Sequence, residues 1–131
     1  MPTISPGITN EKSVAVTIEN TAIAMGSGTL RVFATPAMIA LCEACCAESV
    51  EDLLDEGVTS VGVRIDAEHI AASPLGASIL CKSKLVAVDG RRLDFEFEVY
   101  DNAGLIGKGK HSRFTVDADK FVSKTYAKLK G

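Results

Sequence analysis

The chain has 131 residues, 47% of them hydrophobic and 24% charged, and a formal net charge of −3 at pH 7. This composition is typical of one globular domain, 1–131, which is long enough to bury roughly two-thirds of the surface that its unfolded form exposes. The lack of a basic excess argues against general nucleic-acid binding, and no apolar stretch is long enough to predict insertion in a membrane.

The cysteines indicate a reducing compartment. Cys42, Cys45, Cys46 and Cys81 lie in apolar segments rather than in the loop-rich spacing of disulfide-bonded proteins, so we expect a cytoplasmic protein. Residues three and four apart share a helix face, so a metal site at Cys42–Cys46 is an alternative. Buried cysteine commonly serves as a small hydrophobic residue, and both histidines lie elsewhere, so we expect no metal.

The first segments along the chain predict a strand followed by a small-residue loop. Apolar side chains alternate with small polar ones over Lys12–Ile18, which is typical of a half-buried strand. Met25–Thr29 contains two glycines but no phosphate-binding pattern, so we expect a mobile approach to the next element.

A long helix should begin at Thr35. Threonine is a good N-cap, Pro36 suits the first helical position, and the apolar pattern continues to Leu54 before Gly57 ends it. Glu43 lies where the helix is apolar almost all round. We expect a deeply packed segment in which this carboxylate is paired, protonated or turned toward a pocket.

After the helix, the sequence alternates with the period of strands. The pattern predicts strands over 61–68, 77–88, 91–100 and 105–116, then a short helix or tail over 117–130. Asp89-Gly90 is a strong hairpin turn signal between two of the strands. One strand, one buried helix and four long antiparallel strands predict an α+β fold in which a curved sheet wraps the helix, a hotdog arrangement.

Three side chains in this pattern could act together. Thr35 supplies a hydroxyl, Glu43 a carboxylate and His69 an imidazole, which are the groups needed to activate a nucleophile and transfer its proton. Each also has an ordinary structural explanation: a helix cap, a paired buried acid, and a surface or core histidine. We expect the second histidine, His111, to be a surface or core residue without a catalytic role. The predicted fold brings the first three within reach of one pocket, which favours the catalytic interpretation.

The ordered set of segments resembles the hotdog thioesterases related to fluoroacetyl-CoA thioesterase. The resemblance runs from about Thr17 to Lys124, and the segments that carry it are 32–38, the helix with Glu43, 69–76, 88–93 and 107–114. It implies that Thr35, Glu43 and His69 are catalytic and that Gly62, Arg113 and Phe33 bind substrate. It also implies a homodimer with active sites at the interface and an acyl-CoA substrate. The absence of a metal-binding motif argues against a cofactor.

The resemblance implies hydrolysis of a thioester, with several roles left open. Glu43 would be the general base or a nucleophile that forms an acyl anhydride, because a desolvated carboxylate is more basic than one in water. Thr35 would position water or attack itself, near helix N–H groups that can hold an oxyanion. His69 would orient these groups and transfer a proton.

One region departs from the family pattern. Related enzymes carry phenylalanines in the approach to the catalytic helix, whereas this chain has Gly26-Ser27-Gly28-Thr29 there. The difference favours a generalist enzyme or another acyl-CoA. Basic residues that could contact CoA phosphates, or simply be solvated, are Lys82, Lys84, Arg91, Arg92, Lys108 and Lys110. The alternatives to an enzyme of this kind are a non-catalytic acyl-CoA-binding or regulatory domain and a hydratase on the same fold, whose usual helix motif we do not find.

Overall fold

The computed structural model describes residues 4–130 as five strands and three helices. They are β1 (Thr9–Ala15), α1 (Ala22–Met25), α2 (Thr35–Glu51), β2 (Val58–His69), β3 (Ser78–Asp89), β4 (Arg92–Tyr100), β5 (Leu105–Asp117) and α3 (Ala118–Tyr126), with 3-10 turns at Ile18–Asn20 and Ala127–Lys130.

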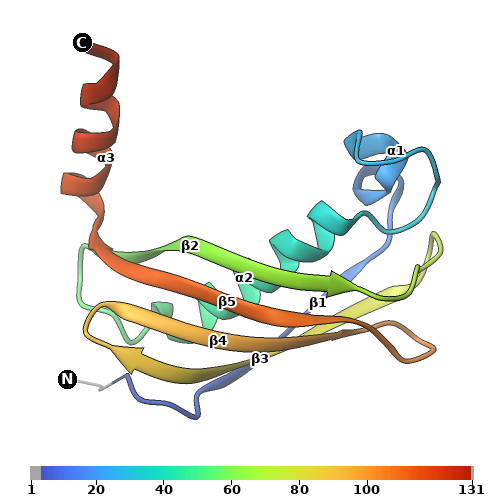
Figure 1. Cartoon of the computed structure of the whole chain (residues 1–131), viewed down its shortest axis with the longest axis horizontal. Helices are drawn as coiled ribbons and strands as arrows, with labels where there is room; N and C mark the ends of the chain where they lie inside the picture. The colour runs from blue at the N-terminus through green and yellow to red at the C-terminus, as the bar shows by residue number, and fades with distance from the viewer. Residues whose placement is uncertain (1–3, 131) are drawn as a thin grey trace.

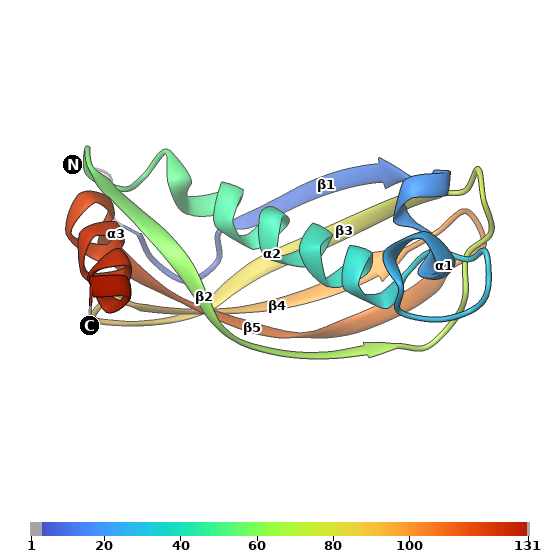
Figure 2. The ribbon, with the colours of Figure 1, turned by 90° about the horizontal axis from the view of Figure 1, so that it is seen from above.

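The strands form one antiparallel sheet in the order β1-β3-β4-β5-β2. The predicted meander from β3 to β5 is confirmed, and the two strands distant in sequence, β1 and β2, form its edges. The sheet curls around α2 along the length of the molecule (Figures 1 and 2). The fold is an α+β hotdog, as the sequence predicts.

Helix α2 is held in place because its apolar side chains are enclosed by the curved sheet. Its buried residues are Met38, Leu41, Cys42, Cys45, Cys46 and Val50. They pack against inward-facing residues of the sheet such as Ile79, Phe97 and Val99. Burial of large apolar side chains contributes about 1.5–3 kcal/mol each, so this contact is the main source of stability.

The first half of the chain differs from its predicted boundaries. The strand lies at Thr9–Ala15, and Ile18, placed in that strand by its alternation, stands in a 3-10 turn with 64% of its surface exposed. The segment expected to be a loop, Met25–Thr29, follows the helical turn α1, which Thr21 caps through its side chain and which ends at Met25. The strand therefore ends at Ala15, earlier than the alternation predicts, because the residues that follow form capped turns.

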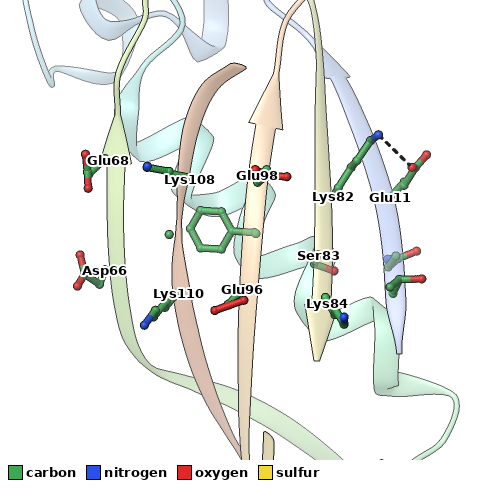
Figure 3. A pocket seen from close by; sticks show the side chains of 14 residues that line it. Glu11, Asp66, Glu68, Lys82, Ser83, Lys84, Glu96, Glu98, Lys108 and Lys110 are labelled. Atoms are coloured by element: carbon green, nitrogen blue, oxygen red, sulfur yellow. Dashed lines mark ion pairs between the residues drawn. The ribbon is translucent and has the colours of Figure 1, made fainter. Parts of the chain in front are cut away.

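Around the hollow drawn in Figure 3, the outer face of the sheet carries charge of one sign on each strand. Acidic Asp66 and Glu68 of β2 lie opposite Lys110 and Lys108 of β5, and the alternation continues across β4, β3 and β1 with Glu96 and Glu98, Lys84 and Lys82, and Glu11. These side chains line a hollow of about 1020 Å³ on the face away from α2. Of the four lysines proposed as phosphate contacts, Lys82, Lys108 and Lys110 thus have acidic neighbours on both sides, whereas Lys84 lies between Glu96 and Thr9.

The two ends of the molecule differ in shape. Helix α1 lies beside the start of α2, and α3 rises from the opposite end beyond the edge formed by β2 (Figure 1). The side chains of Phe121, Val122, Tyr126 and Leu129 are 42%, 52%, 64% and 83% exposed. None of the helices within residues 4–130 combines the length and the apolar character needed to cross a membrane.

Close approach of β2 to β5 requires a glycine. A Cβ atom at Gly109 would overlap the carbonyl oxygen of Asp66 and come within 2.8 Å of the Phe97 ring. We therefore expect Gly109→Ala to lower the free energy of unfolding by roughly 1–3 kcal/mol. Urea denaturation measures this, with Gly28→Ala as control because its Cβ would make only an ordinary contact. Equal unfolding midpoints for the two variants would contradict the proposed strand contact.

Candidate active site

Thr35 and His69 are joined by a hydrogen bond at one end of the molecule. The Thr35 Oγ1 and His69 Nδ1 atoms lie 2.8 Å apart. Ala34, rather than Thr35, is the N-cap of α2, so the prediction of a capping threonine is wrong. Thr35 is the first helical residue, and its hydroxyl is hydrogen-bonded to His69 at the end of β2.

Only one nitrogen of the His69 imidazole, Nδ1, is hydrogen-bonded within residues 4–130. Phe33, 1% exposed, packs its ring edge against the His69 ring with 6.3 Å between centroids. The Nε2 atom of His69 is buried and, within residues 4–130, has no hydrogen-bond partner. Burial lowers the pKa of His69 below its ordinary value, and the backbone of Ala71 opposes this effect. The lowered pKa favours the neutral ring, whose Nδ1 can accept the hydroxyl hydrogen of Thr35.

Glu43 lies in a second cluster, around Gly62 of β2. A Cβ atom at Gly62 would come within 2.8 Å of Glu43 Oε2, 3.1 Å of His111 Cε1 and 3.4 Å of Arg113 Nη1. Three polar side chains thus meet where a glycine leaves room. The segment around Glu43 is deeply packed, as the sequence predicts, whereas Glu43 itself is half-buried.

Arg113 is fixed on β5 by hydrogen bonds along its whole guanidinium group. Its Nε donates to Ser60 Oγ at 2.7 Å, its Nη2 donates to Ser60 O at 2.8 Å, and its Nη1 lies 3.1 Å from His111 Nε2. Only 8% of the residue is exposed. Burial lowers the pKa of Arg113, and Glu43 opposes this, but an arginine remains charged in proteins.

The structure therefore divides the predicted site residues between two places. Thr35, His69 and Phe33 meet at the start of α2, whereas Glu43, Gly62 and Arg113 meet two helical turns further on. Eight residues of helix correspond to about 12 Å along its axis. Within a single chain, the hydroxyl and imidazole are thus separated from the carboxylate.

Two members of the second cluster were not predicted. Ser60 and His111 both bind Arg113, and the sequence placed neither in the site. The available signal was strand periodicity: His111 and Arg113 are two residues apart and must share a face of β5. Placing Ser60 in the cluster requires the β2–β5 pairing, which the sequence alone does not provide.

Comparison with known proteins identifies the family. Residues 16–119 match the family model described as FlK, fluoroacetyl-CoA-specific thioesterase. The chain belongs to this family. It is 35% identical over 97 residues to the fluoroacetyl-CoA thioesterase of Streptantibioticus cattleyicolor, a match that covers 74% of this chain and 70% of that protein.

Solved structures agree with the FlK assignment. A structure of the fluoroacetyl-CoA thioesterase FlK superposes with a TM-score of 0.91 at 28% identity, covering 96% of this chain and 98% of that one. A thioesterase-superfamily protein of Thermus thermophilus gives 0.88 at 25% identity, covering 99% and 96%. Related FlK structures contain fluoroacetate with CoA, or acetyl-CoA. This FlK family member is accordingly a thioester hydrolase that acts on acyl-CoA.

None of the four cysteines is hydrogen-bonded to the site residues of either cluster within residues 4–130. All four are free and buried, and the Sγ atoms of Cys42 and Cys81 are 3.8 Å apart in the core. Burial raises the pKa of the Cys46 thiol to about 12. Among the described residues, no group of three histidine, cysteine or acidic side chains is placed to hold a metal ion.

Both histidines should titrate below pH 6.5. Burial is the largest cause of the lowered pKa of His69 and of His111, and each ring is part of a hydrogen-bonded cluster. We expect each imidazole to be more than half neutral at pH 6.5. Because the unfolded chain binds more protons between the folded and unfolded pKa values, stability should rise with pH through that window. Histidine NMR titration measures both midpoints, and a midpoint above 6.5 for either would contradict the burial argument.

Proposed function

We propose that this enzyme hydrolyses acyl-CoA thioesters with Thr35, Glu43 and His69 as its catalytic residues. The observation that carries the proposal is the hydrogen bond between Thr35 Oγ1 and His69 Nδ1 at the start of α2. A hydroxyl paired with a neutral imidazole is the usual means of activating an oxygen nucleophile or orienting water.

The helix start and the carboxylate have complementary tasks. At the start of α2, the N–H groups of Thr35 and Ala37 lack intrahelical partners and can stabilise the oxyanion that forms when the thioester carbonyl is attacked. Glu43 acts as general base toward water or as a nucleophile that forms an acyl anhydride. His69 transfers a proton between the hydroxyl and the reaction centre. The CoA thiolate is a good leaving group, so little acid catalysis is needed.

We further propose that each active site combines residues of two copies of the chain. Strand β2 is an edge strand with unpaired backbone groups, and antiparallel pairing of two β2 strands would bring Gly62 of one copy near His69 of the other. The Glu43 carboxylate would then approach the imidazole of the partner subunit's His69. This arrangement brings together the three groups that one chain keeps apart.

Features near the β2 edge favour this homodimer. On the outer face, Arg64 lies near Asp66 and Glu68. Antiparallel pairing centred near Asp66 would place Arg64 opposite an acidic residue of the partner. Helix α3, which carries exposed apolar residues, also extends beyond this edge, toward the space that a second copy would occupy (Figure 1). Contacts of this kind are those of an isologous dimer.

We propose that the acyl group is not restricted to fluoroacetyl. The approach to Thr35 is formed by α1 and the following loop, and Gly26–Thr29 contains no aromatic side chain. Exposed Ile23 and Leu30 flank this segment, 53% and 66% exposed, and offer apolar contacts without a bulky lid. A wider entrance of this kind accepts acyl groups larger than acetyl.

Replacement of Glu43 should abolish turnover. We expect Glu43→Gln to lower kcat/KM by at least about a hundredfold, because the amide has the shape of the carboxylate but cannot accept a proton. The measurement is release of free thiol from fluoroacetyl-CoA and from acyl-CoAs ranging from acetyl to long-chain and aromatic, which also ranks the substrates.

Glu48→Gln is the matched control on the same helix. Glu48 is exposed and pairs with Lys12 at 3.0 Å, and such surface pairs contribute little to stability. Its activity should match that of the unmodified enzyme. Retention of turnover by Glu43→Gln would exclude Glu43 as base or nucleophile.

Mixed dimers test whether the site is shared. Thr35→Ala and Glu43→Gln chains, co-expressed with different tags and purified as the heterodimer, should regain about half the activity of the unmodified dimer, because one of its two sites is intact. If Thr35 and Glu43 of one chain served the same site, both sites would be defective and the heterodimer would stay inactive. Each variant homodimer provides the background.

A further inference from the structure

His111 links two parts of the site that the proposed mechanism leaves unexplained. The residue is 2% exposed, and its side chain extends from β5 between the backbone of β2 and the guanidinium of Arg113. It stacks on Phe95 with ring centroids 6.4 Å apart. A residue that only filled the core would need no polar ring in this position.

The hydrogen bonds of His111 specify one protonation state. Its Nδ1 lies 2.7 Å from the carbonyl oxygen of Arg64, which can only accept, so Nδ1 carries the hydrogen. Its Nε2 lies 3.1 Å from Nη1 of Arg113, which can only donate, so Nε2 must offer a lone pair. Both contacts are satisfied only by the neutral Nδ1–H form.

The Arg64 carbonyl belongs to a β-bulge. Gly62 pairs with Arg113 and Arg64 pairs with Ser112, so Val63 has no opposite residue on β5. Bulges re-aim neighbouring residues and are common beside active sites. Here the bulge follows directly after Gly62, where Glu43, His111 and Arg113 meet. The hydrogen bond from His111 therefore holds the backbone next to that glycine.

The Arg113 contact determines where the remaining donors of the guanidinium point. Ser60 occupies Nε and one hydrogen of Nη2, and His111 occupies one hydrogen of Nη1. The other Nη1 hydrogen has no hydrogen-bond partner within the described residues, and Nη1 and Glu43 Oε2 both border the space beside Gly62. An acceptor at the position of His111 Nε2 thus orients Arg113 toward the carboxylate.

We propose that His111 is a positioning residue for thioester hydrolysis, which orients Arg113 toward Glu43 through Nε2 and fixes the β2 bulge through Nδ1–H. The inference rests on the proposed role of Glu43. The link through Arg113 affects the rate of the chemical step, and the link to the bulge affects stability.

Two substitutions separate the links. In His111→Gln, the amide oxygen can reach the position of Nε2 and accept from Arg113, but the side chain gives up the bond to Arg64. In His111→Asn, the shorter amide can donate to the Arg64 carbonyl but does not reach Arg113. We expect His111→Asn to lower kcat at least tenfold with KM changed less than about threefold, and His111→Gln to keep kcat within about threefold of the unmodified enzyme.

A double-mutant cycle tests the route. In an Arg113→Ala background, His111→Asn should lower kcat no further, because the group through which it acts is already gone. Equal loss of kcat in the Gln and Asn variants, or additive losses in the Arg113→Ala background, would overturn the proposal. Glu43→Gln, measured alongside, reports separately on the proposed function, because it removes turnover without touching His111.

The tautomer of His111 can be measured on the unmodified protein, so this test does not depend on whether the variants fold. Long-range proton–nitrogen NMR of the imidazoles distinguishes the tautomers, and His111→Gln identifies which signals belong to His111. We expect hydrogen on Nδ1 and a lone pair on Nε2 at neutral pH. Hydrogen on Nε2 would overturn the proposal, because that atom could then not accept from Arg113.

Discussion

The enclosure of α2 by the curled sheet determines where every candidate site residue lies. Because the helix is apolar almost all round, it stays where the sheet can cover it, with its start beside the end of β2 and its middle beside Gly62. Thr35 and Glu43 occupy these two positions on one rigid element, so their separation follows from helix geometry. The division of the site into two clusters is therefore built into the fold.

The sequence was sufficient for the elements whose signals are local and strong. The hairpin at Asp89-Gly90, the alternation of β3 to β5 and the apolar helix all predict their structures, because one buried face specifies each register. The residues Thr35 and His69 were also correctly expected to meet. Their meeting requires only that a helix start and a strand end lie together in the predicted fold.

Other features depend on contacts between distant segments. Thr35 is a good capping residue by type, yet its hydroxyl bonds His69, 34 residues away, and Ala34 takes the cap position. The bulge at Val63 arises from the pairing of β2 with β5, and the environment of His111 arises from that bulge. No local sequence pattern predicts such a bulge. His111, expected to be a surface or core residue without a role in the site, is therefore found beside the candidate site with both ring nitrogens hydrogen-bonded.

The strand-by-strand alternation of charge bears on how copies of the chain associate. Both edges of the sheet present acidic side chains outward, Glu11 on β1 and Asp66 with Glu68 on β2. Head-to-tail joining of β1 to the β2 edge of another copy would place acid beside acid, and repeated joining of that kind produces open fibrils. Self-pairing of β2 instead sets Arg64 against acidic groups and closes after two copies. The same surface charges thus oppose polymerisation but allow the closed dimer to form.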